Sequence, residues 1–226
     1  MNQPGTSKIS YYGHSCFLIE QSDNKTILLD PYRNREDKIW FKRKMPIVKC
    51  DICLITHAHF DHDEVHILEE TTTILRLPGE FKDASTKITG IGDIHAGRSG
   101  KLNFPNIMFK IETPDLSFLH WGDNRPNVSD EKINQLKDVD ILFIPVDDSF
   151  HLLKFEEIDE IIKIIKPKII IPMHYFMNSI SHEQNGLLPI DNWVTSRTEN
   201  KVYIDTEVFI SRSLFPLETE IWIMNI

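Results

Sequence analysis

The feature that most restricts this chain is a short apolar segment that runs directly into a cluster of histidines. Residues 52–56 form a nearly continuous apolar run, which is typical of a strand covered on both faces. The sequence His57-Ala58-His59-Phe60-Asp61-His62 follows at once, so three imidazoles and a carboxylate fall within six residues. A fold that contains this segment must place several titratable side chains at the end of a core strand.

This pattern is typical of a metal centre, because imidazole nitrogens and carboxylate oxygens are ligands of zinc, iron and manganese sites. His57 and His59 are two residues apart, so in extended chain they point to the same side and can share one metal. Asp61 and His62 follow where we expect the chain to turn into a helix over residues 63–70, and their changed direction suits a second metal nearby. The alternative is a histidine-rich surface turn. Four such groups side by side would repel one another once protonated, which favours the metal centre.

The rest of the chain is rich in strands, with a few helices. A polar turn at 21–25 separates apolar runs at 15–20 and 26–30, which predicts a hairpin. Ser129 is a candidate N-cap for a helix through Leu136, and the spacing of apolar residues predicts a helix over 155–165. Further strands are expected at 72–77, 86–91, 107–113, 116–121, 140–146, 168–173, 202–204, 208–211 and 220–224. This order suggests an α/β fold, and no linker divides residues 1–226, so we expect a single domain.

Composition narrows the class of protein. The 226 residues are 41% hydrophobic and 26% charged, which is typical of a globular protein and not of a disordered one. The net charge of −9 does not favour nucleic acid or an anionic membrane as a partner. The chain begins without the apolar segment of a signal peptide, and its apolar runs are too short to span a membrane. Three cysteines cannot all pair, which favours a reducing compartment, so we expect a cytoplasmic location.

Several motifs along the chain resemble one family. His-x-His-x-Asp-His after an apolar strand is the signature of the metallo-β-lactamase superfamily of metal-dependent hydrolases. The chain resembles this superfamily from about residue 9 to residue 175, and is most similar to its ascorbate-6-phosphate lactonase-like branch. The other matching motifs are Gly13-His14-Ser15-Cys16-Phe17-Leu18-Ile19, Leu28-Leu29-Asp30-Pro31, Ile94-His95-Ala96-Gly97, Gly122-Asp123 and Ile171-Pro172-Met173-His174-Tyr175.

The resemblance implies a fold and a set of ligands. The fold would be a four-layer αββα sandwich, with two mixed sheets inside and helices outside. The cofactor would be two divalent transition-metal ions, with zinc expected and manganese or iron as alternatives. His57, His59 and His95 would hold the first metal, Asp61, His62 and His174 the second, and Asp123 would bridge them.

The resemblance also implies an activity. The protein would be a hydrolase that uses a metal-bound hydroxide on a small ester, lactone or phosphorylated substrate, and Asp61 would orient the hydroxide and pass a proton to the leaving group. Two alternatives stay open: a phosphodiesterase or nuclease of the same superfamily, and a non-catalytic member that only binds. The partner would be a small molecule. The substrate, the metal and the oligomeric state are not determined by the sequence.

Other polar residues lie beside the expected site. His14 either supports a ligand or contacts substrate, or is only a hydrogen-bonded turn residue; both interpretations stay open. His120 and Asp30 are expected to support the ligands by hydrogen bonds. Three residues that follow a buried strand depart from the family pattern: Asp147, Asp148 and His151. We expect these to be solvated, and a pocket for a cationic or hydroxyl-rich ligand is the alternative.

Overall fold

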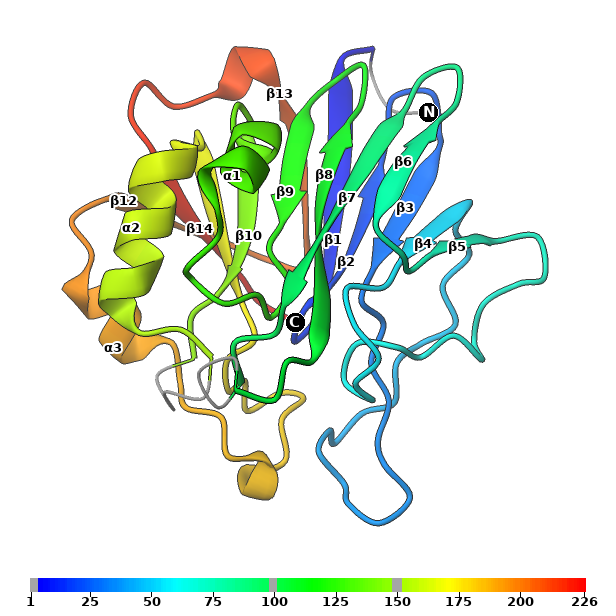
Figure 1. The fold of residues 1–226 in the computed structure, drawn as a ribbon, viewed down its shortest axis with the longest axis vertical. Coiled ribbons are helices and arrows are strands. Elements are labelled where there is room, and N and C mark those ends of the chain that lie inside the picture. The colour runs from blue at the N-terminus through cyan, green and yellow to red at the C-terminus, as the bar shows by residue number, and fades with distance from the viewer. Residues whose placement is uncertain (1–3, 98–100, 148–151) are drawn as a thin grey trace.

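Two β-sheets stacked face to face form the protein in the computed structural model, which describes residues 4–97, 101–147 and 152–226 (Figure 1). The first sheet has six strands in the order β13 (Glu207–Ser211), β1 (Thr6–Gly13), β2 (Cys16–Glu20), β3 (Thr26–Leu29), β4 (Ile52–Leu54) and β5 (Thr73–Leu75). Pairing is antiparallel from β13 to β3 and parallel from β3 to β5, so this sheet is mixed.

The second sheet has eight strands and is also mixed. Their order is β12 (Asn200–Ile204), β14 (Glu220–Met224), β11 (Ile169–Met173), β10 (Ile141–Pro145), β9 (Ser117–His120), β8 (Pro105–Glu112), β7 (Lys87–Ile94) and β6 (Gly79–Lys82). Strands from β12 to β9 are parallel, and those from β9 to β6 are antiparallel. Every residue of β10 and β11 is buried, as their apolar sequences predict.

The core lies between the sheets and under the helices. Phe17 of β2 packs on Phe143 of β10, with ring centroids 4.4 Å apart, so the two sheets meet directly. The helices are α1 (Asp130–Leu136), α2 (Phe155–Ile165) and α3 (Asp191–Ser196), and Figure 1 shows them on the side of the eight-stranded sheet. Two short 3₁₀ helices, η2 (Glu183–Asn185) and η3 (Arg212–Leu214), lie in the C-terminal part. Two mixed sheets with a few helices agree with the sandwich expected from the sequence, but among the described residues the α-helices lie on the side of the eight-stranded sheet and form one outer layer, not two.

The helix expected over residues 63–70 is wrong. That segment is a series of turns, in which His62 N–H donates to the His59 carbonyl and Leu68 N–H donates to the Val65 carbonyl. With no helix at 63–70, the α-helices of the described chain all connect strands of the eight-stranded sheet. The apolar residues of segment 63–70, Val65, Ile67 and Leu68, are only partly buried against the core, so no buried face stabilises a helix there. Strands β1 and β6 and helix α3 are not anticipated from the sequence.

In each sheet, several strands run in the same direction, so their carboxyl ends lie at one edge of the sheet. In the six-stranded sheet β1, β3 and β4 run parallel to one another, and in the other sheet β7, β9, β10 and β11 do so. The carboxyl ends of parallel strands meet at the same edge of a sheet. Among the described residues, no helix is long and apolar enough to cross a membrane.

Candidate metal centre

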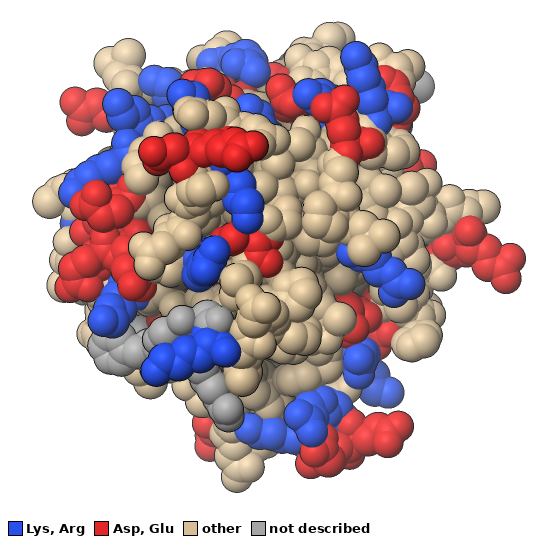
Figure 2. Space-filling view, in the orientation of Figure 1, with Lys and Arg blue, Asp and Glu red and all other residues tan. Residues whose placement is uncertain are grey.

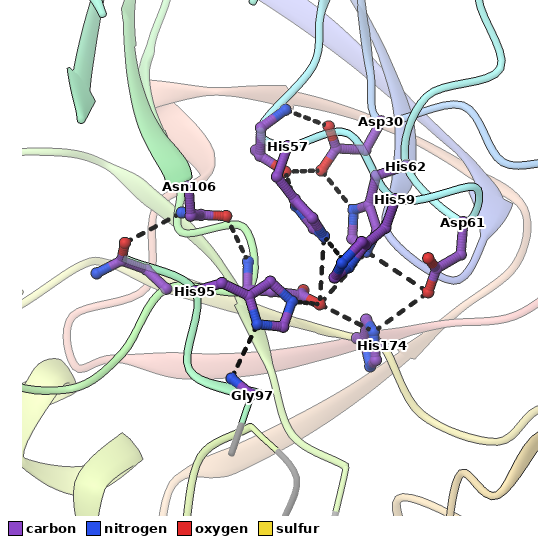
Figure 3. Close-up of polar contacts among 12 residues, drawn as sticks. Asp30, His57, His59, Asp61, His62, His95, Gly97, Asn106 and His174 are labelled. Atoms are coloured by element: carbon purple, nitrogen blue, oxygen red, sulfur yellow. Dashed lines mark hydrogen bonds and ion pairs between the residues drawn. The ribbon is translucent and has the colours of Figure 1, made fainter. Parts of the chain in front are cut away.

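Histidine and aspartate side chains from both sheets converge at the carboxyl ends of these strands (Figure 3). The six-stranded sheet supplies them from the ends of β1, β3 and β4, and the eight-stranded sheet from the ends of β7, β9 and β11. The side chains that lie in the cluster are His14, Asp30, His57, His59, Asp61, His62, His95, His120, Asp123 and His174. All are buried except His59, which is partly exposed.

The first group of potential ligands consists of His57, His59 and His95, whose ligand atoms lie within 4.8 Å of one another. His57 Nε2 and His59 Nδ1 are 3.0 Å apart, and the backbone N–H of Gly97 donates to His95 Nδ1 at 2.8 Å. This contact leaves His95 Nε2 directed at Asp123 Oδ2, 3.3 Å away. The side chains of His57 and His59 therefore lie beside that of His95.

The second group contains Asp61, His62 and His174 together with His14. Asp61 Oδ2 lies 3.8 Å from the Nε2 atoms of both His62 and His174, and 3.1 Å from His14 Nε2. Figure 3 shows Asp61 and His174 facing each other beside His62. Chain positions more than a hundred residues apart thus meet at one point.

Asp123 lies between the two groups. Its Oδ2 is 3.3 Å from the Nε2 atoms of His95 and His174, 3.5 Å from that of His62 and 3.9 Å from that of His57. A zinc ion takes nitrogen and oxygen ligands at about 2.0–2.2 Å, which places neighbouring ligand atoms of a tetrahedral ion about 3.4 Å apart. The separations around Asp123 are therefore those of ligands that surround a metal.

Buried polar atoms without hydrogen-bond partners also indicate a metal centre. His62 Nε2, His95 Nε2 and Asp123 Oδ1 are buried and have no hydrogen-bond partner among the described residues. A buried polar atom without a partner costs about 1–3 kcal/mol, and a coordinated cation removes that cost. The residues present thus fit a metal centre, on donor chemistry as well as on geometry.

Asp30 holds one side of the cluster. Its Oδ2 accepts hydrogen bonds from His62 Nδ1 at 2.8 Å, His120 Nε2 at 2.9 Å and Thr56 Oγ1 at 2.7 Å, and its Oδ1 accepts from the Thr56 backbone N–H at 2.8 Å. Since the proton of Thr56 Oγ1 goes to Asp30, this oxygen accepts from His57 Nδ1, 2.9 Å away. Both His57 and His62 therefore carry their proton on Nδ1 and present the Nε2 lone pair to the centre.

Burial and neighbouring charges set the protonation states. Burial lowers the pKa of His57 well below its ordinary value, and the nearby His62 adds to this effect. Burial alone would raise the pKa of Asp123, but His174 and His62 outweigh it and hold that pKa well below the usual range. For Asp61 too, burial would raise the pKa, and His62 and His14 bring it below the ordinary value. Burial would lower the pKa of His62, but Asp123, Asp30 and Asp61 outweigh it and raise that pKa well above the ordinary value. Metals bind neutral imidazole and ionised carboxylate, so a cation bound at His62 replaces a proton.

The loop that carries Asp123 depends on a close approach of the backbone. Gly122 has φ +58°, and a Cβ there would lie 2.8 Å from both Asn106 Oδ1 and Thr56 Cβ. Asn106 Oδ1 in turn accepts the backbone N–H of Asp123 at 3.1 Å. Glycine is therefore required before Asp123, by conformation and by space.

The sequence comparison decides the family. Residues 8–174 match the model of the beta-lactamase superfamily domain. The chain belongs to this superfamily. Relatives include the UPF0173 metal-dependent hydrolases of Bacillus cereus (strain AH820), 28% identical over 199 residues, and of Staphylococcus aureus (strain MRSA252), 26% identical over 200 residues. Each alignment covers 74% of this chain and 85% of the relative.

A solved structure of the superfamily has the same fold. A metallo-beta-lactamase superfamily protein from Thermotoga maritima superposes with a TM-score of 0.75 at 24% sequence identity, and the match covers 96% of this chain and 98% of that protein. The two mixed sheets expected from the sequence are thus confirmed as the sandwich of the metallo-β-lactamase superfamily.

Residues outside the seven superfamily positions divide into three cases. His14, His120 and Asp30 lie against potential ligands, where the sequence placed them without settling their contacts. Asp147 is buried, and accepts the backbone N–H of Leu188 at 2.7 Å, so the expectation that it is solvated is wrong. It anchors the loop before α3. Asp148 and His151 lie outside the described residues.

Thr56 and Asn106 are the functional positions that sequence reasoning missed. Thr56 precedes the His57 motif and connects Asp30 with His57, whereas Asn106 is on β8 and supports Asp123. For Thr56 the signal is its place between a strand of apolar residues and the first histidine. No local pattern marks Asn106, because its partners are 17 and 18 residues away.

Proposed function

We propose that this protein is a metal-dependent hydrolase that cleaves a small ester, lactone or phosphorylated molecule at a centre of two divalent transition-metal ions. The observation that carries this proposal is the position of Asp123 Oδ2, within 3.9 Å of histidines from both groups of potential ligands. Superfamily membership and the hydrolase names of the relatives support it. The chain is a hydrolase of the metallo-β-lactamase superfamily; the substrate class is the proposal.

We assign the ligands as follows. His57, His59 and His95 hold one metal, Asp61, His62 and His174 hold the other, and Asp123 contributes to both. Zinc suits a set made only of imidazoles and carboxylates, and manganese or iron would also suit it. Two divalent cations also balance the negative charge that Asp61 and Asp123 bring into a buried site.

The reaction divides between the cofactor and the chain. When bound, two divalent ions polarise the substrate and lower the pKa of water so that it attacks at neutral pH. We assign Asp61 as the catalytic residue of the chain: its carboxylate lies beside His62 and His174, where it would orient the attacking water and carry a proton to the leaving group. Asp30 accepts hydrogen bonds from His62 and His120 and so fixes the orientation of both imidazoles.

The placement in the ascorbate-6-phosphate lactonase-like branch is part of this proposal. It rests on the overall resemblance of residues 9–175 to that branch. A polyanionic substrate is less well supported. Figure 2 shows cationic and anionic side chains interspersed over one face of the molecule, without a continuous basic track, and the net charge is −9.

The test is a substrate panel on the metal-loaded protein, with Asp61→Ala as the inactive variant. Lactones, aryl esters, phosphate monoesters and phosphodiesters are compared, and Asp205→Ala, which removes an exposed carboxylate, is the control. We expect Asp61→Ala to lower kcat at least about 100-fold without unfolding the chain, because loss of a proton-transfer group typically costs that much. Asp205→Ala should be as active as the wild type.

Each outcome separates the candidate functions. Hydrolysis of an ester, lactone or phosphate monoester that depends on Asp61 supports the proposal. Activity confined to phosphodiesters or nucleic acid would replace it with the phosphodiesterase alternative. A protein that holds two metals but hydrolyses nothing in the panel would be the non-catalytic binding member.

A further inference from the structure

His14 is the histidine that the end of β1 brings to the centre. It follows Gly13 at the end of β1, and its backbone adopts φ +56°, a left-handed conformation that costs energy for a residue with a side chain. Two hydrogen bonds hold the His14 carbonyl there: it accepts from Tyr11 Oη and from the backbone N–H of His174, each at 3.0 Å. The end of β1 is thus tied to the end of β11 in the other sheet.

This backbone directs the imidazole at Asp61. His14 Nε2 lies 3.1 Å from Asp61 Oδ2, and the ring is only 1% exposed. The His174 ring lies beside it at 4.1 Å between centroids, and Phe41 meets it edge-on at 5.3 Å. Packing on two sides therefore leaves the imidazole little freedom to turn.

The hydrogen bonds of His14 are opposite to those of His57 and His62. Asp61 is a carboxylate and can only accept, so His14 carries its proton on Nε2 and donates it to Asp61. His14 Nδ1 has no hydrogen-bond partner among the described residues. His57 and His62 have the reverse arrangement, with Nδ1 beside an acceptor and Nε2 left for a cation. His14 therefore differs from His57 and His62 in that its Nε2 is engaged with a carboxylate as a donor.

We propose that His14 is a positioning residue, which donates a hydrogen bond from Nε2 to Asp61 Oδ2 and thereby keeps this oxygen beside His62 and His174. A carboxylate oxygen has two lone pairs, so Oδ2 accepts from His14 and still faces the second metal subsite. Carboxylates that bind metals are held by such hydrogen bonds, and removing the donor typically costs 10- to 100-fold in metal affinity or activity. This inference rests on the proposed function, since it assigns Asp61 to the metal centre.

Two substitutions of His14 separate the effect of its hydrogen bond to Asp61 from the effect of losing the bulk of the imidazole. His14→Gln places an amide donor near the position of the imidazole Nε2. His14→Asn places its amide donor near the position of Nδ1, because the asparagine side chain is too short to reach Asp61. Asparagine also tolerates a positive φ, so His14→Asn keeps the backbone. His66→Asn, at an exposed histidine, is the matched control.

The measurement is a Co²⁺ titration of metal-free protein, followed by calorimetry and by the visible absorption of the bound ion. We expect His14→Asn to weaken one of two Co²⁺ equivalents by about 10- to 100-fold and to change its absorption band. His14→Gln and His66→Asn should stay within about 3-fold of the wild type. If His14→Gln loses the equivalent as fully as His14→Asn, the side chain is not acting as an Nε2–H donor and the proposal is wrong.

A double-mutant cycle tests whether His14 acts through Asp61. In the Asp61→Ala background, His14→Asn should have no further effect on Co²⁺ affinity. Equal effects in both backgrounds would mark a general structural role and overturn the proposal. These readouts need no substrate, so the inference can fail while the hydrolase activity stands, and the reverse is also possible.

Discussion

At the scale of single residues, the centre depends on side chains that use both of their polar ends. His62 donates from Nδ1 to Asp30 and leaves Nε2 buried at 3.5 Å from Asp123 Oδ2. His57 does the same through Thr56. A ligand whose far nitrogen is held in this way cannot rotate out of the site, so the geometry exists before a metal arrives.

How much of this could be read from the sequence depends on the distance between partners. His57, His59, Asp61 and His62 follow from residue type and spacing within one segment. His95 and Asp123 needed the family resemblance, because nothing in their own neighbourhood distinguishes them from ordinary loop residues. His174 follows an apolar strand as His57 does, but its role as a ligand also came from the resemblance. Contacts such as Asn106 with Asp123 are made only after folding and leave no local pattern.

Replacing His174 tests the assignment of the second subsite. His174→Ala removes a nitrogen that lies 3.3 Å from Asp123 Oδ2, so it should selectively weaken one of two metals. Loss of a supporting hydrogen bond already costs up to about 100-fold in affinity, and loss of a ligand should cost at least that. Elemental analysis after dialysis should find close to one metal per chain. His182→Ala, in the loop after β11, is the control. Unchanged stoichiometry and affinity would remove His174 from the set of ligands.

At the scale of elements, the site is an assembly of strand ends. Strands predicted from apolar runs, such as β4 and β11, are present and lead into His57 and His174 as expected. The helix expected over 63–70 fails because its apolar residues, Val65, Ile67 and Leu68, are only partly buried against the core. Edge strands such as β6, with Glu80 and Lys82 exposed, carry little apolar pattern and so were not predicted.

A substitution at Gly13 tests how the end of β1 is built. Gly13 has φ +101°, and a Cβ there would lie 2.2 Å from Ile180 Cδ1 and 2.5 Å from Ile226 Cδ1. Gly13→Ala should therefore combine backbone strain of about 1–2 kcal/mol with overpacking of about 1–3 kcal/mol in the free energy of unfolding. Urea denaturation measures the loss.

Gly5→Ala separates the two causes. Gly5 also has a positive φ, +74°, but a Cβ there meets nothing within 4 Å, so this variant should lose only the strain. Equal losses at Gly5 and Gly13 would show that the contacts with Ile180 and Ile226 do not restrict this turn. A larger loss at Gly13 would explain why the residue before His14 is a glycine.

At the scale of the whole molecule, the two sheets are joined both by a hydrophobic core and by the centre at one end. The buried apolar residues form one contiguous cluster that includes strands of both sheets. His57, Asp61 and His62 come from the six-stranded sheet, whereas His95, Asp123 and His174 come from the other. A cation held by both groups therefore ties one sheet to the other, and folding and metal binding should be coupled.

Metal removal tests this coupling. A metal present at about 100 times its dissociation constant stabilises the fold by about 2.7 kcal/mol per site. For a domain of this size, 1 kcal/mol corresponds to about 2–4 °C in Tm, so the chelated and dialysed protein should melt at least about 5 °C lower than the metal-loaded one. Without cations, His62 Nε2, His95 Nε2 and Asp123 Oδ1 also remain buried without hydrogen-bond partners among the described residues.

Adding the metal back is the control for its removal. Adding Zn²⁺ or Mn²⁺ back should restore the Tm, with elemental analysis returning to about two equivalents per chain. In the Asp61→Ala, His174→Ala double variant the shift on chelation should be roughly halved, because only the subsite of His57, His59 and His95 still responds. A Tm that does not change when both metals are lost would mean that the sheets are held by the core alone, and that the centre contributes chemistry without contributing stability.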